Sequence, residues 1–184
     1  MQPLETMRNE HGLIRQYLDS LELAAEKLKN NQRPPSEYFE TAAKFSKKFS
    51  NEFHHVKEEY MMFVRLAQKK GGEMDGQIEA LRHQHEHERD FFAEILGAMQ
   101  GYTKGDPMAT SRVVENLGAL TAMERQHIHT EDHVFFPLVE QEFSADEMEQ
   151  VRVEFDKMRA KLGETTFEDC HKMVVEMNSM LAHL

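Results

Sequence analysis

The stretch His127-Ile128-His129-Thr130-Glu131-Asp132 decides the fold, because it repeats an earlier stretch, His54-His55-Val56-Lys57-Glu58-Glu59. Each begins with His-x-x-x-Glu, continues with a second acidic residue, and is followed by aromatic or Met residues. Four residues make about one turn of an α-helix, so the imidazole and carboxylate of each pair point the same way and can share one ion. The repeat therefore predicts two helices that carry matched pairs of candidate ligands.

Around these stretches, apolar residues recur three and four positions apart, as in amphipathic helices, and Gly and Pro residues separate the segments. The four expected helices cover about residues 4–29, Ser36 to Gly71-Gly72, 74–101 and 108–141. Helices of this length with short connections favour an all-α, up-down-up-down four-helix bundle.

Two capping-box patterns follow the fourth helix, and each predicts a further helix. The first runs from Ser144 to Glu147 and the second from Thr165 to Glu168. We therefore expect residues 1–143 to form the bundle, and residues 144–184 to form a C-terminal helical extension. The extension should pack on the outside of the bundle or provide the contact of a homodimer.

Composition argues against several classes of partner. The chain has 184 residues and a formal net charge of -11, which disfavours binding to nucleic acid or to an anionic membrane. The single cysteine, Cys170, cannot form an internal disulfide and is expected to be a small buried residue. Met1 to Glu5 do not resemble a secretory leader, and no stretch is apolar enough to span a bilayer, so a cytoplasmic location is expected.

Two further histidines complete a pattern of internal symmetry. His11 precedes the first His-x-x-x-Glu pair, and His85 precedes the second at nearly the same interval. Packed about a pseudo-two-fold axis, the two helix pairs would offer four histidines and two glutamates. Imidazoles together with carboxylates that can bridge suit a binuclear centre of first-row metals, and the core of a helical bundle is where such centres are built.

A helical wheel at about 100° per residue indicates which of these side chains face the core. His127 and Glu131 lie on the apolar stripe of their helix, and His85 lies on that of the third helix. His11 lies at the edge of its stripe. The apolar residues that define the stripes of the third and fourth helices are Leu81, Phe92, Met99, Leu117, Leu120, Val134 and Leu138. The side chains expected to face away from the core are His83, His87, His129, Asp132 and His133, while His171 and His183 are expected on the surface.

The second helix is the exception. Its apolar stripe is rotated well away from His54 and further from Glu58, so His55 or Glu59 could take a ligand role instead. The residues of this stripe are Ala42, Phe49, Phe53, Tyr60 and Val64.

The sequence resembles the hemerythrin-like family, which carries the HHE cation-binding motif. The resemblance rests on Glu10-His11, on the two repeated stretches, on Gln84-His85, and on Phe135-Phe136-Pro137-Leu138, and it covers roughly the first three quarters of the chain. It implies a non-haem centre of two iron ions with oxo and carboxylate bridges inside a four-helix bundle. By this resemblance the metal ligands are His11, His54, Glu58, His85, His127 and Glu131.

The resemblance also bears on function. Oxygen-carrying hemerythrins use a His-x-x-x-His pair on the third helix, a spacing that His83 and His87 have here, and a His-x-x-x-x-Asp spacing that fits His127 and Asp132. The wheel and the repeat favour His85 and Glu131 instead, as in iron-sulfur repair and sensor relatives.

The first hypothesis is therefore binding or sensing of O2 or NO, with Glu10 and Glu88 as outer acceptors for the imidazoles. The alternative is a di-iron oxidase or peroxidase, or an iron donor for cluster repair. A metal-free helical interaction protein is a third possibility. The choice of iron over manganese or zinc rests mainly on the resemblance.

Overall fold

The computed structural model describes residues 2–184, and this part of the chain contains helices and no strand. The all-α class is therefore confirmed. The helices, in chain order, are α1 (Pro3–Lys29), α2 (Ser36–Phe45), η1 (Ser46–His55), η2 (Glu58–Phe63), α3 (Val64–Lys70), α4 (Asp75–Thr103), α5 (Pro107–Thr130), η3 (Glu131–Phe135), α6 (Phe136–Glu142), α7 (Ala145–Leu162) and α8 (Thr166–Ala182). The segments labelled η are π-helices, which continue the α-helices on either side without a break.

Helix ends follow the local sequence closely. Asp106 caps α5 by accepting a hydrogen bond from the backbone N–H of Met108 at 2.9 Å. Ser144 accepts from the backbone N–H of Glu147, whose carboxylate in turn accepts from the backbone of Ser144, so the capping box that opens α7 is confirmed. The second capping box is wrong in detail: α8 begins as predicted, but Thr165 donates its hydroxyl to Asp169 instead of accepting from the backbone.

The π-helical segments lie where the second and fourth helices carry their His-x-x-x-Glu pairs. A π-helix has i to i+5 hydrogen bonds, so each residue turns through a smaller angle than in an α-helix, and such segments are frequent at functional sites. The wheel at 100° per residue therefore fails beyond Phe53: Tyr60 is 69% exposed and Val64 39% exposed, although both were placed on the apolar stripe. Val134, in η3, is 53% exposed for the same reason.

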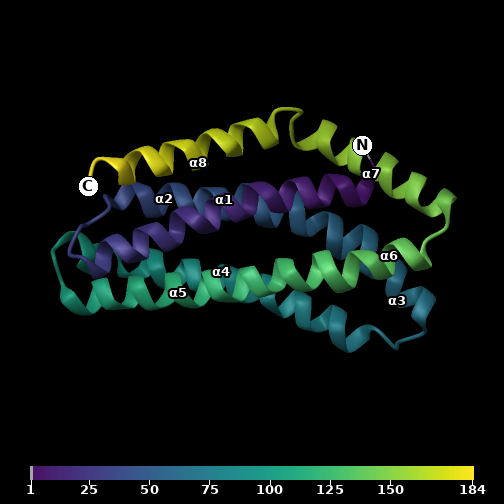
Figure 1. Ribbon diagram of the computed structural model, residues 1–184, viewed down its shortest axis with the longest axis horizontal. Coiled ribbons are helices and arrows are strands. Elements are labelled where there is room, and N and C mark those ends of the chain that lie inside the picture. Colours follow the sequence, from purple (N-terminus) through teal and green to yellow (C-terminus); the bar gives the residue numbers. More distant parts are fainter. Residues whose placement is uncertain (1) are drawn as a thin grey trace.

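The long helices lie side by side along the longest dimension of the molecule (Figure 1). α5 packs against both α1 and α4, and α2 packs against α4. α8 lies along α1 and α2, and α7 contacts α1 and η2, so the C-terminal helices cover one side of the molecule. At the hairpin between α4 and α5, Gly101 allows a close approach, because a Cβ there would lie 2.8 Å from the Cβ of Ala109. None of the helices within residues 2–184 is long and apolar enough to cross a membrane.

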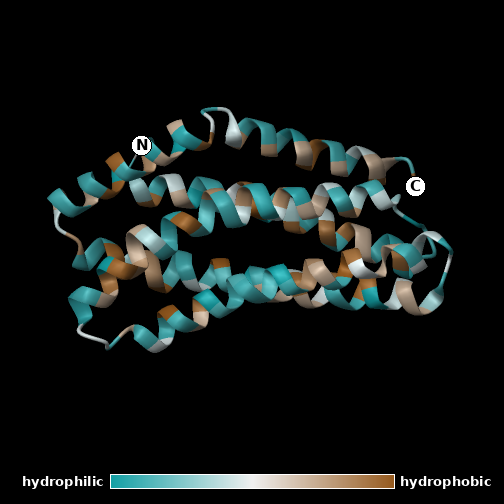
Figure 2. Cartoon of the chain, turned by 180° about the vertical axis from the view of Figure 1, so that it is seen from behind, coloured by the Kyte–Doolittle hydropathy of each residue, from teal (hydrophilic) through white to brown (hydrophobic). Residues whose placement is uncertain are grey.

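Hydrophobic and hydrophilic residues alternate on the long helices (Figure 2), and the buried apolar residues form two separate clusters. One cluster includes Leu13, Phe53 and Phe92, and the other includes Met7 and Phe135. Along each long helix, buried polar residues lie between the residues of the two apolar clusters, and together they form what we call the polar layer. Its members are Glu10, His11, His54, His55, Lys57, Glu58, His85, Glu88, Glu124, His127 and Glu131.

Candidate metal centre

The six candidate ligands named from the sequence all lie in this polar layer. Each is at most 1% exposed, and they come from α1, η1, η2, α4, α5 and η3. Burial of so many ionisable side chains costs free energy unless they are paired or coordinate an ion. The packing of the two apolar clusters on either side therefore places charge and hydrogen-bonding capacity in the middle of the core.

Glu58 and Glu131 each face histidines with both carboxylate oxygens. Oε1 of Glu58 lies 3.2 Å from Nε2 of His54, and Oε2 lies 3.5 Å from Nε2 of His85. Oε1 of Glu131 lies 3.2 Å from Nε2 of His127, and Oε2 lies 3.2 Å from Nε2 of His11. Each carboxylate thus lies between two imidazoles, as a bridging ligand would.

The potential ligand atoms fall into two groups, and within each group they lie within 4.8 Å of one another. One group contains His11, His54, Glu58 and Glu131. The other contains His55, Glu58, His85 and His127. Glu58 belongs to both, so the two candidate groups share one carboxylate.

His55 is the residue that the resemblance left out of the ligand set. Its ring stacks on that of His85, with centroids 3.6 Å apart, and it is 3% exposed. η1 brings both His54 and His55 into the layer, so His55 remains a candidate ligand beside His54. Glu59, the other alternative, instead accepts a hydrogen bond from Nδ1 of His85 at 2.7 Å.

Each of the other imidazoles donates its Nδ1–H to an outer acceptor, which turns Nε2 toward the centre of the layer, where the Nε2 atoms of His85 and His127 lie 3.1 Å apart. His54 donates to Glu10 at 2.9 Å, and His11 donates to Asp132 at 2.9 Å. His127 donates to the amide oxygen of Gln84 at 2.8 Å.

Two of these outer acceptors, the carboxylates of Glu10 and Asp132, are each paired with a cationic side chain. Glu10 accepts from the buried Lys57, and Asp132 accepts from Arg15. Asp132 was expected to face away from the core, and this is wrong. Because η3 changes the helical register, its side chain reaches His11 and is only 12% exposed.

Unsatisfied buried atoms show that this donor set fits metal ions. Within residues 2–184, Nε2 of His11 and all four carboxylate oxygens of Glu58 and Glu131 are buried without a hydrogen-bond partner. Buried polar atoms are rarely left without a partner, and carboxylate oxygens beside imidazole nitrogens are ligands that first-row metals accept. The residues present therefore fit a carboxylate-bridged pair of such ions.

The pKa values of the histidines point to the same need for positive charge. Burial acts to lower the pKa of His54, but Glu58 and Glu10 raise it to about 10. Burial likewise opposes protonation of His127, while Glu131 raises its pKa to about 9. Without a metal, protonated histidines would balance the negative charge of the buried carboxylates, and metal binding would release these protons.

Two further buried glutamates of this layer, Glu88 and Glu124, do not belong to the His-x-x-x-Glu pairs. Glu88 lies one turn after His85 on α4, and Glu124 lies one turn before His127 on α5. Burial raises the pKa of Glu88 to about 7 and that of Glu124 to about 8. Glu88 was expected to accept from an imidazole, yet its Oε2 is 3.8 Å from Nδ1 of His55, which is too long for a hydrogen bond. Glu124 was missed, although its position three residues before His127 on the same face could have indicated it.

The remaining histidines lie outside the layer. Those that are exposed are His83, His87, His129, His133, His171 and His183. His83 pairs with Glu79 and Glu86 on its own helix, and His129 stacks on His133 with ring centroids 4.2 Å apart.

Comparison with known proteins agrees with this arrangement. The family model of the hemerythrin HHE cation binding domain matches residues 2–139, and it matches again over residues 78–182. The chain therefore belongs to the hemerythrin HHE cation-binding family. Uncharacterized proteins of Mycobacterium bovis and Mycobacterium tuberculosis are 24% identical to it over 178 residues, which cover 96% of this chain and 69% of each relative. No solved structure matches the chain significantly.

Proposed function

We propose that this protein holds two non-haem iron ions in the polar layer and binds or senses O2 or NO there. The observation that carries the proposal is the set of four buried, unpartnered oxygens of Glu58 and Glu131, which face imidazoles from four long helical segments. When bound, the iron pair would supply reduced metal at which a diatomic gas can coordinate.

The ligands would divide between two positions. His11 and His54 would hold one ion, and His55, His85 and His127 the other, with Glu58 and Glu131 bridging. The first position would then have one imidazole fewer. This arrangement extends the six ligands implied by the family resemblance by one residue, His55, and it belongs to the up-down-up-down bundle that we also propose.

The chain's own residues would shield the centre from water. Phe136 stacks on His11 with ring centroids 5.3 Å apart, and Phe63 stacks on His85 at 6.2 Å. Both phenylalanines are fully buried. An apolar wall of this kind limits the escape and side reactions of reactive species, as a sensor or carrier requires.

Absorption spectroscopy of anaerobic, iron-loaded protein tests this function. The spectrum is recorded before and after one equivalent of NO or O2, with iron counted on the same sample. A stoichiometric change that reverses when the gas is removed is expected. Sustained consumption of peroxide or O2 with a reductant would instead establish the oxidase or peroxidase alternative.

The matched variants are His127→Ala and His129→Ala. The first should lose iron and the spectral change, because Nε2 of His127 faces Glu131. The second should keep both, because His129 is exposed on the same helix. Full retention of iron in His127→Ala would overturn the proposal.

A further inference from the structure

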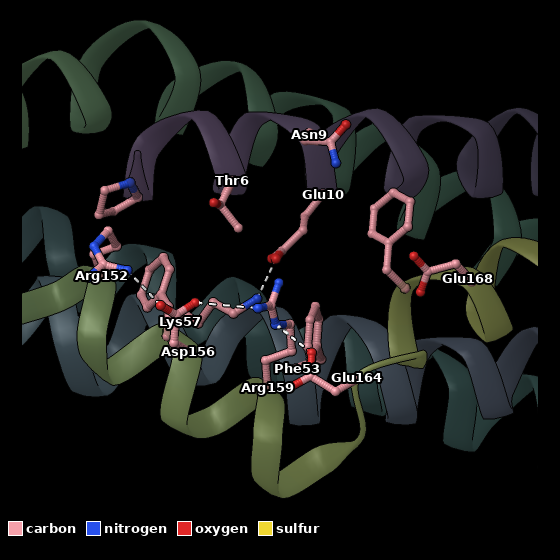
Figure 3. A pocket seen from close by; sticks show the side chains of 13 residues that line it. Thr6, Asn9, Glu10, Phe53, Lys57, Arg152, Asp156, Arg159, Glu164 and Glu168 are labelled. Carbon is pink, nitrogen blue, oxygen red and sulfur yellow. Dashed lines mark hydrogen bonds and ion pairs between the residues drawn. The ribbon is translucent and has the colours of Figure 1, made fainter. Parts of the chain in front are cut away.

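A cavity of about 550 Å³ lies beside the polar layer, between α1, η1, α7 and the beginning of α8, and Glu10 and Lys57 of the layer form part of its wall (Figure 3). This volume falls within the range of about 300–1,000 Å³ that is common for small-molecule sites. Its walls combine aromatic rings with charged groups. The aromatic residues are Phe53, Phe155 and Phe167.

Lys57 forms the most unusual part of the lining. Its side chain is only 2% exposed, and its ammonium lies 3.5 Å from the centroid of the Phe53 ring. An ammonium has three N–H donors. Among the residues that the structure describes, Glu10 is the one acceptor that it reaches. A buried cation with spare donors at the wall of a cavity suits an anionic ligand.

A second cation faces the same space. Arg159 is close enough to Lys57 for its charge to lower the pKa of the Lys57 ammonium (Figure 3). The side chain of Arg159 is 53% exposed. Its Nε lies 3.1 Å from Glu164, and its Nη2 lies 3.6 Å from Asp156. A guanidinium has five N–H donors, so most of its capacity remains available to a ligand.

Arg152 lines the same cavity but is already engaged. It donates to Glu149 at 2.8 Å and 2.6 Å and to Asp156 at 2.7 Å. These contacts offset the charge of Asp156, just as Lys57 offsets that of Glu10. The lining also includes the carboxylates of Glu164 and Glu168. An incoming carboxylate would therefore share Lys57 with Glu10, and Arg159 with Glu164 and Asp156, through the N–H donors that these contacts leave free.

We propose that this cavity binds a small organic carboxylate with an apolar body. The carboxylate would lie between Lys57 and Arg159, and the body would lie against Phe155 and Phe167. Binding in the cavity would also affect the candidate metal centre, because Glu10 accepts from Lys57 with one oxygen and from Nδ1 of His54 with the other. A ligand that accepts a hydrogen bond from Lys57 would change the strength of the hydrogen bond between Glu10 and His54. This second part rests on the proposed function.

Calorimetric titration of the iron-loaded protein with benzoate tests the site, with benzamide as the uncharged analogue. Saturable binding of benzoate, and much weaker binding of benzamide, is expected. Arg159→Gln should weaken benzoate binding by about tenfold or more, as the loss of a charge-assisted contact requires. Arg112→Gln is the matched control, because it makes the same charge change in another part of the bundle, where Arg112 pairs with Glu94. Absent saturation, or equal affinity in the Arg159 variant, would overturn the proposal.

The absorption spectrum of the same sample tests the coupling to the centre. Saturating benzoate should shift the bands of the iron-loaded protein, and the shift should disappear at the same concentration in Arg159→Gln. A shift that persists in that variant would mean that benzoate binds the metal directly, and no shift would mean that occupancy is not transmitted. Either result overturns the coupling. Binding to the metal-free protein is measured as well, so failure of the cavity and failure of iron loading can be told apart.

Discussion

The Nδ1–H of His11 on α1 donates to Oδ1 of Asp132 in η3 at 2.9 Å, and this contact joins residues 121 positions apart in the chain. Asp132 is in turn held by Arg15, one turn after His11 on α1. The contact orients the ring so that its Nε2 faces the oxygens of Glu131 and Glu58, at 3.2 Å and 3.9 Å. Asp132, which follows the candidate ligand Glu131 in sequence, thus positions the candidate ligand His11 on another helix.

Removing this acceptor should weaken metal binding without removing a ligand. We expect Asp132→Ala to lower metal affinity by about 10–100-fold, the usual effect of losing an outer partner of a metal-bound histidine. His133→Ala, an exposed neighbour, should leave it unchanged. Competition with a chromophoric chelator measures both. Equal affinities in the two variants would show that the contact does not orient His11.

Substitution of His55 tests how the candidate ligands divide between the two proposed metal positions. Because it belongs to one group of ligand atoms only, His55→Ala should weaken one metal position and leave the other. Glu58→Gln should weaken both, because Glu58 belongs to both groups. Iron counting after gel filtration, at limiting and at excess iron, distinguishes the two. Wild-type iron content in His55→Ala would restore the six-residue ligand set.

The metal-free protein should become less stable as the pH rises above 6.5. The folded-state pKa values of His54, about 10, and His127, about 9, lie above the usual histidine value of 6.5. A raised pKa contributes stability that is complete below 6.5 and is lost as the pH rises through the folded-state value.

Glu88 and Glu124 act in the same direction, since their raised pKa values mean that ionising them in the core destabilises the fold. Burial lowers the pKa of His55 well below 6.5, so its opposite effect falls outside this range. Urea unfolding at pH 6.5 and pH 9.5, with and without metal, measures the effect. Stability of the metal-free form that rises with pH would contradict it.

Two glycines on α4 should respond oppositely to the same substitution. Gly97→Ala should stabilise the protein by up to about 1 kcal/mol, because alanine favours helix and a Cβ at this position meets nothing within 4 Å. Gly101→Ala should destabilise it, because the new Cβ would lie 2.8 Å from the Cβ of Ala109. Thermal unfolding of both variants measures the contrast. A Gly101 variant as stable as the Gly97 variant would show that the hairpin relaxes freely.

The capping box of α7 provides a similar pair. Ser144→Ala should cost about 0.5–2 kcal/mol, since it removes an acceptor of the helix backbone. Thr165→Ala should cost much less, because the Thr165 hydroxyl donates to the exposed Asp169 side chain and does not cap the backbone of α8. Denaturant unfolding of the metal-loaded protein compares them.

Most helix bounds could be predicted from the sequence, because Pro, Gly and capping residues act locally. The first expected helix covered about residues 4–29, and α1 spans Pro3–Lys29. The direction in which a side chain points could be predicted only where the helix is α-helical throughout. His85 lies on the unbroken α4, and its burial follows from the 3.6-residue period.

In the second helix, η1 and η2 change that period, so the wheel misplaced His54, Glu58 and Tyr60. A π-helix depends on tertiary contacts and leaves little trace in apolar spacing. What remained in the sequence was the His-x-x-x-Glu repeat itself, which does not depend on the exact rotation of the helix. The outer contacts, such as Asp132 with His11, join different helices and could not be read from one segment.

The central claim is most directly tested by a crystal structure of the iron-loaded protein with anomalous differences measured at the iron absorption edge. Two adjacent anomalous peaks are expected in the polar layer. One should lie among His11, His54, Glu58 and Glu131, and the other among His55, Glu58, His85 and His127. A single peak, or iron bound only at surface residues, would contradict the binuclear centre.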